Sequence, residues 1–362
     1  MTLRRQIEIW VVVLVVFVAL LWLLSDILLP FIAGMVLAYF LDPAADALER
    51  RGLPRIAATS VILLTSLLIF AALILLVVPI LSGQIAKFTA NLPAYLKGAV
   101  AFVDASMPEW IKQRLTRSGF DTTRPLTDFA SSAAGWAASI IGSLWSGGLA
   151  LVNALSLIVV TPVVAFYMLN DWDRMVRTVD SWLPRDHADT IRRLATEIND
   201  VLAGFIRGQG TLCLALGTFY AVALMAAGLD FGLLIGLVTG FLSFIPFVGA
   251  ITGGLLSIGM AMVQFWPDWT HVLVIAGIFV LGQFLEGNVL QPRLVGHSVG
   301  LHPVWLMFAL FAFGYLFGFV GVLLAVPMAA AMGVLTRFLL KQYLSSRLYL
   351  GTESDGAGAG TP

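Results

Sequence analysis

Charged residues and cysteine are scarce in this sequence. Asp, Glu, Lys and Arg make up 12% of its 362 residues, whereas soluble domains carry about 25%. The 21 basic side chains balance the 21 acidic ones, and a net charge of zero argues against a nucleic-acid partner. A single cysteine, Cys213, excludes an intrachain disulfide, and its apolar surroundings favour a packing role.

Signature motifs of the common enzyme classes are absent as well. The sequence contains no P-loop, nucleophile elbow or HExxH pattern, so it gives no basis for ATP coupling or hydrolysis. His271 and His302 have no further ligands at metal-binding spacing, and we expect them at a membrane interface. We therefore expect a protein that is not an enzyme, with no cofactor and no metal site.

Long apolar runs are what the sequence has in abundance. Hydrophobic residues make up 59% of the chain, and its mean hydropathy is +0.94. Several windows reach the ~20 apolar residues that cross a hydrocarbon core. The predicted fold class is an all-α polytopic membrane protein with about eight transmembrane helices and one or two re-entrant or broken helical hairpins in the C-terminal half. The lipid bilayer is its first expected partner.

The N-terminal half divides into three parts. Residues 1–81 predict three transmembrane helices, and residues 136–170 predict a fourth, with a break at Pro162. Between them, residues 82–135 predict an extracytoplasmic amphipathic helical segment. Its apolar face could cover the membrane surface, another subunit or the protein's own core.

The C-terminal half also has three parts. Residues 171–207 carry six basic and seven acidic side chains, which indicates a solvated cytoplasmic helix pair. Residues 208–345 form a glycine-rich transport core, and residues 346–362 are expected to be a disordered tail. Basic residues near the span ends predict that both termini are cytoplasmic.

Glycine is concentrated in the transport core, since 21 of the 34 glycines lie between Gly204 and Gly333. Some repeat every four residues, which would place them on one face of a helix. This expected helix-packing face consists of Gly228, Gly232, Gly236 and Gly240. Small residues at this spacing let helices approach closely in lipid. Static packing and sliding of one bundle against another both explain the pattern.

Glycine and proline also interrupt the apolar runs of the core, as in transporters with broken helices near the bilayer midplane. Residues 244–254 are expected to break at a proline, and residues 304–340 are expected to bend near two glycines. A third helix is expected to end or kink at Pro292, which cannot donate a backbone hydrogen bond. The expected breaks and hinges are Pro246, Gly249, Gly253, Gly254, Pro292, Gly318 and Gly321.

Polar residues cluster within 281–296, at the end of a membrane-length apolar run. Ionisable groups at membrane depth cost ~3 kcal/mol on insertion scales and usually face a partner or a water-filled path. The expected pathway or coupling residues are Gln283, Glu286, Asn288, Gln291, Arg293 and Ser298. Glu286 is the best candidate for proton coupling. The alternative is that Glu286 pairs statically with Arg293 or with another helix. Arg207 and Gln209 are weaker signals, for a gate or an interfacial anchor.

Five segments resemble those of the autoinducer-2 exporter family of bacterial permeases. They are LPFIAGMVLAYFLDP (29–43), TPVVAFYMLNDWD (161–173), FIRGQ (205–209), FIPFVG (244–249) and EGNVLQPR (286–293). The likeness extends over residues 10–345. It implies a bacterial inner-membrane protein that forms a homo-oligomer, with a pentamer as the expected form. It also implies export of a small signalling molecule by an elevator-like movement, although some members resemble sodium/proton antiporters.

Three functions are open at this point. We favour a secondary exporter of a small polar molecule, with the quorum-sensing signal autoinducer-2 as one candidate, which would need partners such as Asn288, Gln291 and Ser298. A sodium (or lithium)/proton antiporter would instead need a titratable carboxylate, for which Glu286 is the candidate. The third function is a non-transporting membrane scaffold that recruits a partner through residues 82–135.

Overall fold

The structure is a computed structural model, and it describes residues 12, 16, 19, 20, 22–106, 148–296 and 302–350. Every secondary-structure element within these ranges is helical. The predicted all-α fold class is therefore confirmed.

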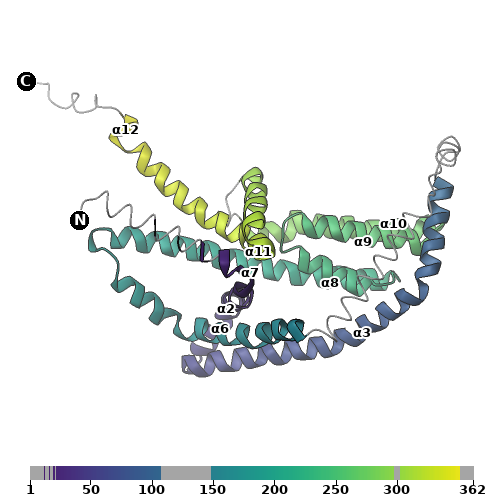
Figure 1. Ribbon diagram of the computed structural model, residues 1–362, viewed down its shortest axis with the longest axis horizontal. Coiled ribbons are helices and arrows are strands. Elements are labelled where there is room, and N and C mark those ends of the chain that lie inside the picture. Colours follow the sequence, from purple (N-terminus) through teal and green to yellow (C-terminus); the bar gives the residue numbers. More distant parts are fainter. Residues whose placement is uncertain are drawn as a thin grey trace, which may run out of the picture.

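The helices follow one another in chain order and are drawn in Figure 1. They are α2 (Ser25–Glu49), α3 (Arg55–Ser106), α6 (Gly148–Ser181), the 3-10 turn η1 (Arg185–His187), α7 (Ala188–Ala226), α8 (Gly232–Leu242), α9 (Val248–Phe265), α10 (Trp269–Leu285), the π-helix η2 (Glu286–Val295), α11 (Pro303–Leu344) and α12 (Arg347–Leu350).

Six helical stretches among the described residues are long and apolar enough to cross a membrane. They are Ile27–Glu49, Arg55–Gln84, Arg185–Ala226, Val248–Phe265, Trp269–Val295 and Pro303–Leu344. Much of the first expected span and the start of the fourth lie outside the described residues. The expected total of about eight spans therefore stays a prediction.

Helices α2, α3 and α6 pack against one another and form what we call the N-terminal group. Gly34 of α2 lies so close to α6 that an added Cβ would meet Val164 at 2.7 Å. Helix α3 continues past residue 81 without interruption, and at 1.5 Å per residue its 52 residues extend about 78 Å. It curves along the molecule in Figure 1. Residues 82–106 thus belong to the same helix as the third span, and 107–135 lie outside the described residues.

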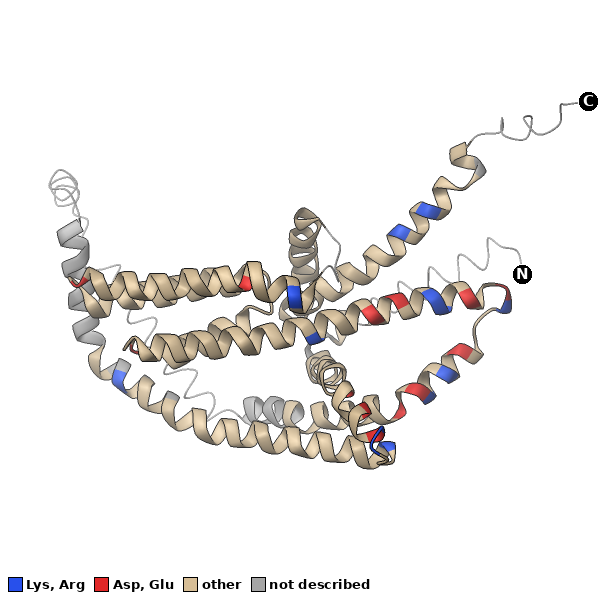
Figure 2. Cartoon of the chain, turned by 180° about the vertical axis from the view of Figure 1, so that it is seen from behind, with Lys and Arg blue, Asp and Glu red and all other residues tan. Residues whose placement is uncertain are grey.

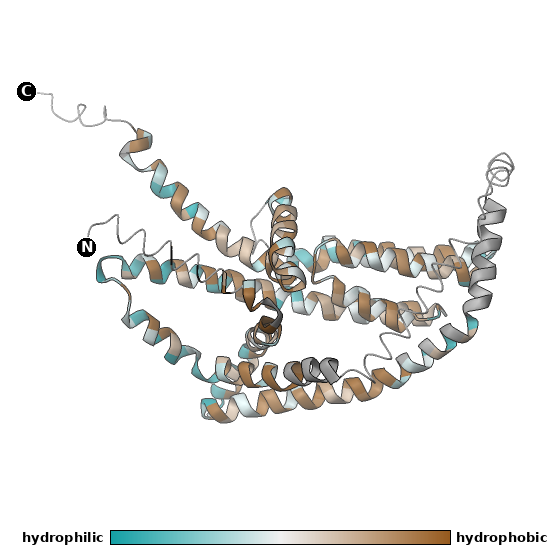
Figure 3. Cartoon of the chain, in the orientation of Figure 1, coloured by the Kyte–Doolittle hydropathy of each residue, from teal (hydrophilic) through white to brown (hydrophobic). Residues whose placement is uncertain are grey.

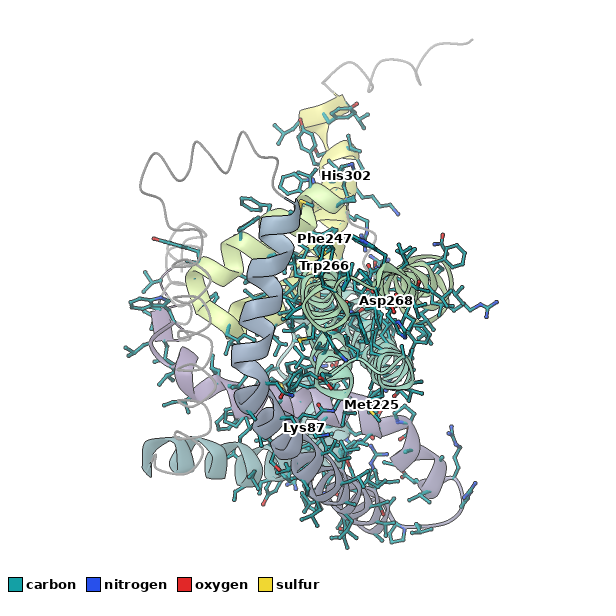
Figure 4. All side chains as sticks on the ribbon, turned by 90° about the vertical axis from the view of Figure 1, so that its right-hand side faces the viewer. Lys87, Met225, Phe247, Trp266, Asp268 and His302 are labelled. Carbon is teal, nitrogen blue, oxygen red and sulfur yellow. The ribbon has the colours of Figure 1, made fainter. Side chains whose placement is uncertain are left out.

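Helices α7 to α11 form the C-terminal group, in which α7 contacts α8, α10, α11 and η2. Its core gathers around buried apolar side chains of α7, which are Leu212, Leu216, Tyr220 and Leu224. In Figure 4, which looks along these helices, the turn between α9 and α10 with Trp266 and Asp268 lies at the near end. Helix α7 therefore runs through the centre of the group.

Charge and hydropathy are distributed unevenly along the molecule. Charged residues gather where α6 meets α7 and where α2 meets α3 (Figure 2), and the long apolar stretches cover α3 and the paired helices α8–α10 (Figure 3). Residues 171–207 are the adjoining ends of α6 and α7 with η1 between them. Arg192 joins the two helices by bonding Asp180 at 2.7 Å. Within 346–362, which we expected to be disordered, Arg347–Leu350 is helical and 351–362 lie outside the described residues.

Three of the four glycines of the expected packing face lie on α8 and face the backbone of α7. A Cβ on Gly232 would meet Leu224 at 2.8 Å, and Cβ atoms on Gly236 and Gly240 would meet the backbone of Ala221 and Gly217. Gly228 does not share this face, because it lies before α8 in the turn that ends α7, with φ 74°. The four-residue spacing of the glycines in the sequence thus includes Gly228, although α8 begins only at Gly232.

The helical hairpin α8–α9 turns at the expected proline. Helix α8 ends at Leu242 and α9 begins at Val248, so Pro246 lies in the turn between them. With 11 residues, α8 extends about 16 Å and is too short to cross a bilayer. A Cβ on Gly249 would collide with Ser243, which caps the end of α8, and a Cβ on Gly253 would collide with the side chain of Thr239 in α8. The hairpin is therefore closely packed from its turn onward.

Helix α11 bends sharply at Gly318, where φ is 59° and ψ is −139°. After the bend the chain folds back on itself, since a Cβ on Gly321 would collide with the carbonyl of Phe313. A positive φ is costly for residues other than glycine. This agrees with the bend that we expected near these two glycines.

Candidate functional site

The polar cluster lies where α10 changes from α-helix to π-helix. Helix α10 ends at Leu285, and η2 runs from Glu286 through Pro292 to Val295. The helix therefore does not end at Pro292: the change to π-helix comes six residues earlier, at Glu286, and the end comes at Gly296. A kink at Pro292 stays a prediction. Each π-helical N–H bonds five residues back, which moves the carbonyl that a proline ring meets in an α-helix. Short π-helical segments are frequent at functional sites.

Glu286 and Gln283 face α7 and contact each other. The amide Nε2 of Gln283 donates to Oε2 of Glu286 at 3.0 Å and lies 3.2 Å from the hydroxyl of Tyr220. Glu286 and Gln283 are half-buried. We call Tyr220, Gln283 and Glu286 the carboxylate cluster.

The tyrosine of the cluster is held firmly in place. Its hydroxyl donates to the carbonyl of Phe279 at 3.3 Å, and its ring stacks on Phe279 with centroids 5.7 Å apart. It also lies directly over Gly282, where any Cβ would collide with the Tyr220 ring. The missing side chain at Gly282 is thus what lets α7 and α10 bring these polar groups together.

The remaining expected site residues do not join this cluster. Asn288, Gln291 and Arg293 are exposed, and Asn288 donates to the carbonyl of Phe284 at 3.2 Å. Ser298 lies outside the described residues. Among the ion pairs of the described residues, none joins Glu286 to Arg293 or to another helix. Within the described part of the chain, Glu286 therefore has no static ion pair.

A second polar centre lies on α7, one stretch of which contacts three other elements. Arg207 donates to the carbonyl of Tyr39 at 2.8 Å and to Asp42 at 3.1 Å, both on α2. Gly208 is packed against the Leu294 carbonyl of η2. The buried Gln209 donates to the carbonyl of Ser243, beside the α8–α9 turn, at 2.6 Å. We call Arg207–Gln209 the α7 junction.

Sequence reasoning gave the junction little weight. The available signal was the presence of an arginine and a glutamine within a motif at the start of an apolar run. Their partners are 34 to 168 positions away along the chain, so spacing could not have identified them.

Two open grooves lie on the surface of α6, away from the carboxylate cluster. One, of about 500 Å³, is lined by side chains of α2 and α6, and the other, of about 470 Å³, is lined by α6 and by Trp182 directly after it. They share Tyr167. Neither includes a residue of the C-terminal group, so neither marks the candidate site.

Comparison with known proteins gives consistent matches. The model of the AI-2E family transporters matches residues 11–341. "Putative transport protein YrrI" of Bacillus subtilis is 30% identical over 324 residues, which covers 87% of either chain. "Putative permease PerM" of Escherichia coli K12 is 27% identical, covering 88% of this chain and 89% of its own. "AI-2 transport protein TqsA" of the same strain is 25% identical, covering 84% and 83%.

Proposed function

Since this chain belongs to the AI-2E transporter family, we propose that it is a secondary transporter that exports a small polar molecule across the bacterial inner membrane. The chain is a multi-pass membrane protein of a bacterial permease family, and relatives carry the names of transport proteins and permeases. Inner-membrane location, cytoplasmic termini and a homo-oligomer, with a pentamer as the expected form, belong to the proposal.

One observation carries it: two opposite charges lie in one candidate span and are not paired with each other. Glu286 and Arg293 both belong to Trp269–Val295. Each ionisable group facing lipid costs roughly 3 kcal/mol on insertion scales, and a pair would lower that cost. Two charges that pair neither with each other nor with another charged group among the described residues are therefore best accounted for by a polar, water-accessible path along η2.

The carboxylate cluster has the chemistry to bind a neutral polar solute. Gln283 occupies Oε2 of Glu286, and the carboxylate retains capacity to accept further hydrogen bonds from hydroxyl groups. Asn288 and Gln291 present exposed amides on the same π-helix. A small hydroxyl-rich molecule fits these groups, and the name of TqsA makes autoinducer-2 the first solute to test.

We further propose that transport involves an elevator-like movement of the C-terminal group. The breaks at Pro246 and Gly318 support this, because broken helices permit segments to move as units, and the glycine face packs α7 and α8 closely within one such unit.

The test is flux in proteoliposomes that contain the purified protein and an internal pH dye. We expect autoinducer-2 efflux that falls at least about tenfold in Glu286→Gln, equivalent to about 1.4 kcal/mol, with unchanged expression. Glu49→Gln is the matched control, because Arg55 keeps Asp42 and Asp46 when Glu49 is neutralised. Sodium- or lithium-evoked proton movement that is lost in Glu286→Gln would identify an antiporter instead. Absence of all flux would favour a scaffold.

A further inference from the structure

Hydrogen bonding between the two helix groups, among the described residues, depends heavily on one arginine, while packing of α3 against α9 and of α2 against α11 also joins the groups. Among the described residues, three hydrogen bonds join α2 and α7, and two of them come from the guanidinium of Arg207. The third runs from the Tyr39 hydroxyl to Asn199 at 2.9 Å. Only one of the three, from Arg207 to Asp42, joins two charged groups.

Asp42 is held in place within the N-terminal group by a bond that does not involve Arg207. Its Oδ1 accepts from Arg55 of α3 at 2.9 Å, while its Oδ2 faces Arg207. Arg55 also bonds Asp46 at 2.6 Å, Glu49 at 3.0 Å and the carbonyl of Leu169 in α6 at 2.8 Å. This network belongs wholly to the N-terminal group, so it would keep the Asp42 carboxylate positioned if the groups separated.

On the other side, the helix around Arg207 is tied to the C-terminal group through the residues that follow it. Gly208 is in backbone contact with η2, and Gln209 bonds the carbonyl of Ser243 at the end of α8. Asp42 is the one carboxylate that pairs with Arg207 among the ion pairs of the described residues. If the C-terminal group moves, Arg207 would move with it and leave Asp42 behind.

We propose that the Arg207–Asp42 ion pair is a releasable latch between the N-terminal and C-terminal groups. The side chains are 39% and 35% exposed. Pairs this accessible to solvent contribute little, so the latch would bias the equilibrium between closed and separated arrangements only about fivefold. Such a contact can break on each cycle, which a buried pair would resist. A role of the latch in transport rests on the proposed function, whereas the latch itself concerns only the contact between the two helix groups.

Distances between spin labels test the latch without any transported solute. Labels at exposed Ser60 of α3 and exposed Thr218 of α7 report across the groups, in a Cys213→Ser background and diluted into unlabelled protein. Labels at Thr218 and exposed Thr336 of α11 report within the C-terminal group. We expect one dominant distance across the groups in the parent protein.

In Arg207→Gln, a second population across the groups should rise about fivefold, with the Thr218–Thr336 distance unchanged. Arg337→Gln is the control, because Arg337 pairs at 3.6 Å with Glu197 inside the C-terminal group. Unaltered distances across the groups in Arg207→Gln would overturn the latch, as would an equal change within the C-terminal group. Should Arg207→Gln fail to insert, Asp42→Asn gives the same test, because it removes the carboxylate that pairs with Arg207.

The outcome is separable from that of the proposed function. Absence of flux in the parent protein would refute transport and leave the distance result valid. Flux that persists with unchanged distances in Arg207→Gln would refute the latch alone.

Discussion

Replacing Gly236 by alanine tests whether α7 and α8 pack backbone against backbone. A Cβ at this position would collide with the backbone nitrogen and Cα of Ala221 and lie 2.7 Å from the carbonyl carbon of Tyr220. None of these atoms belongs to a flexible side chain that could turn away. The two helices must separate to accept one methyl group, and α7 is the central helix of the group.

Overpacking of this kind is expected to lower the free energy of unfolding by roughly 1–3 kcal/mol. The better helix propensity of alanine, about 1 kcal/mol, offsets part of this loss. Gly277→Ala is the matched control, because Gly277 lies inside α10 with no atom within 4 Å of the added Cβ. The assay is thermal unfolding of both variants in the same detergent, followed by flux in proteoliposomes.

We expect Gly236→Ala to unfold at a lower temperature than the parent protein and Gly277→Ala to unfold at the same or a higher one. Gly236→Leu should insert into the membrane and block transport. If Gly236→Ala is as stable as Gly277→Ala, the close packing of α7 and α8 is refuted. Full activity of Gly236→Leu would contradict a role of this face in movement.

Three further predictions concern the cluster, the bend in α11 and the α6–α7 turn. Tyr220→Phe removes the hydroxyl that bonds the carbonyl of Phe279, so we expect the free energy of unfolding to fall by about 1 kcal/mol and the flux to slow. Unchanged stability and unchanged flux would show that the hydroxyl contributes to neither. Gly321→Ala should destabilise more than Gly83→Ala, whose Cβ meets nothing within 4 Å; equal melting temperatures would contradict the fold-back. Arg192 lowers the pKa of Asp180 by its hydrogen bond, so the turn should be stabilised above the usual Asp pKa of about 4 and loosen as pH falls through the lowered value. Amide exchange in residues 182–187 measures this, and Asp180→Asn should abolish the pH dependence.

The amino-acid sequence by itself determined the class of the protein and several local features. Apolar length alone predicts membrane helices, because the hydrocarbon core sets how many residues are needed. The breaks at Pro246 and Gly318 also follow from local chemistry, since proline lacks an N–H and glycine tolerates positive φ. Gln283 and Glu286 are three residues apart, so their contact on one helix face was predictable.

Only the tertiary structure decided which distant groups meet. Tyr220 and Gln283 are 63 positions apart, and Arg207 and Asp42 are 165 apart. These contacts depend on how α7 packs against α10 and α2, and helix periodicity does not encode packing partners. The same holds for Gly228, which has the spacing of a packing face and lies in a turn instead, because the residue at which a helix begins is set by packing and capping rather than by spacing.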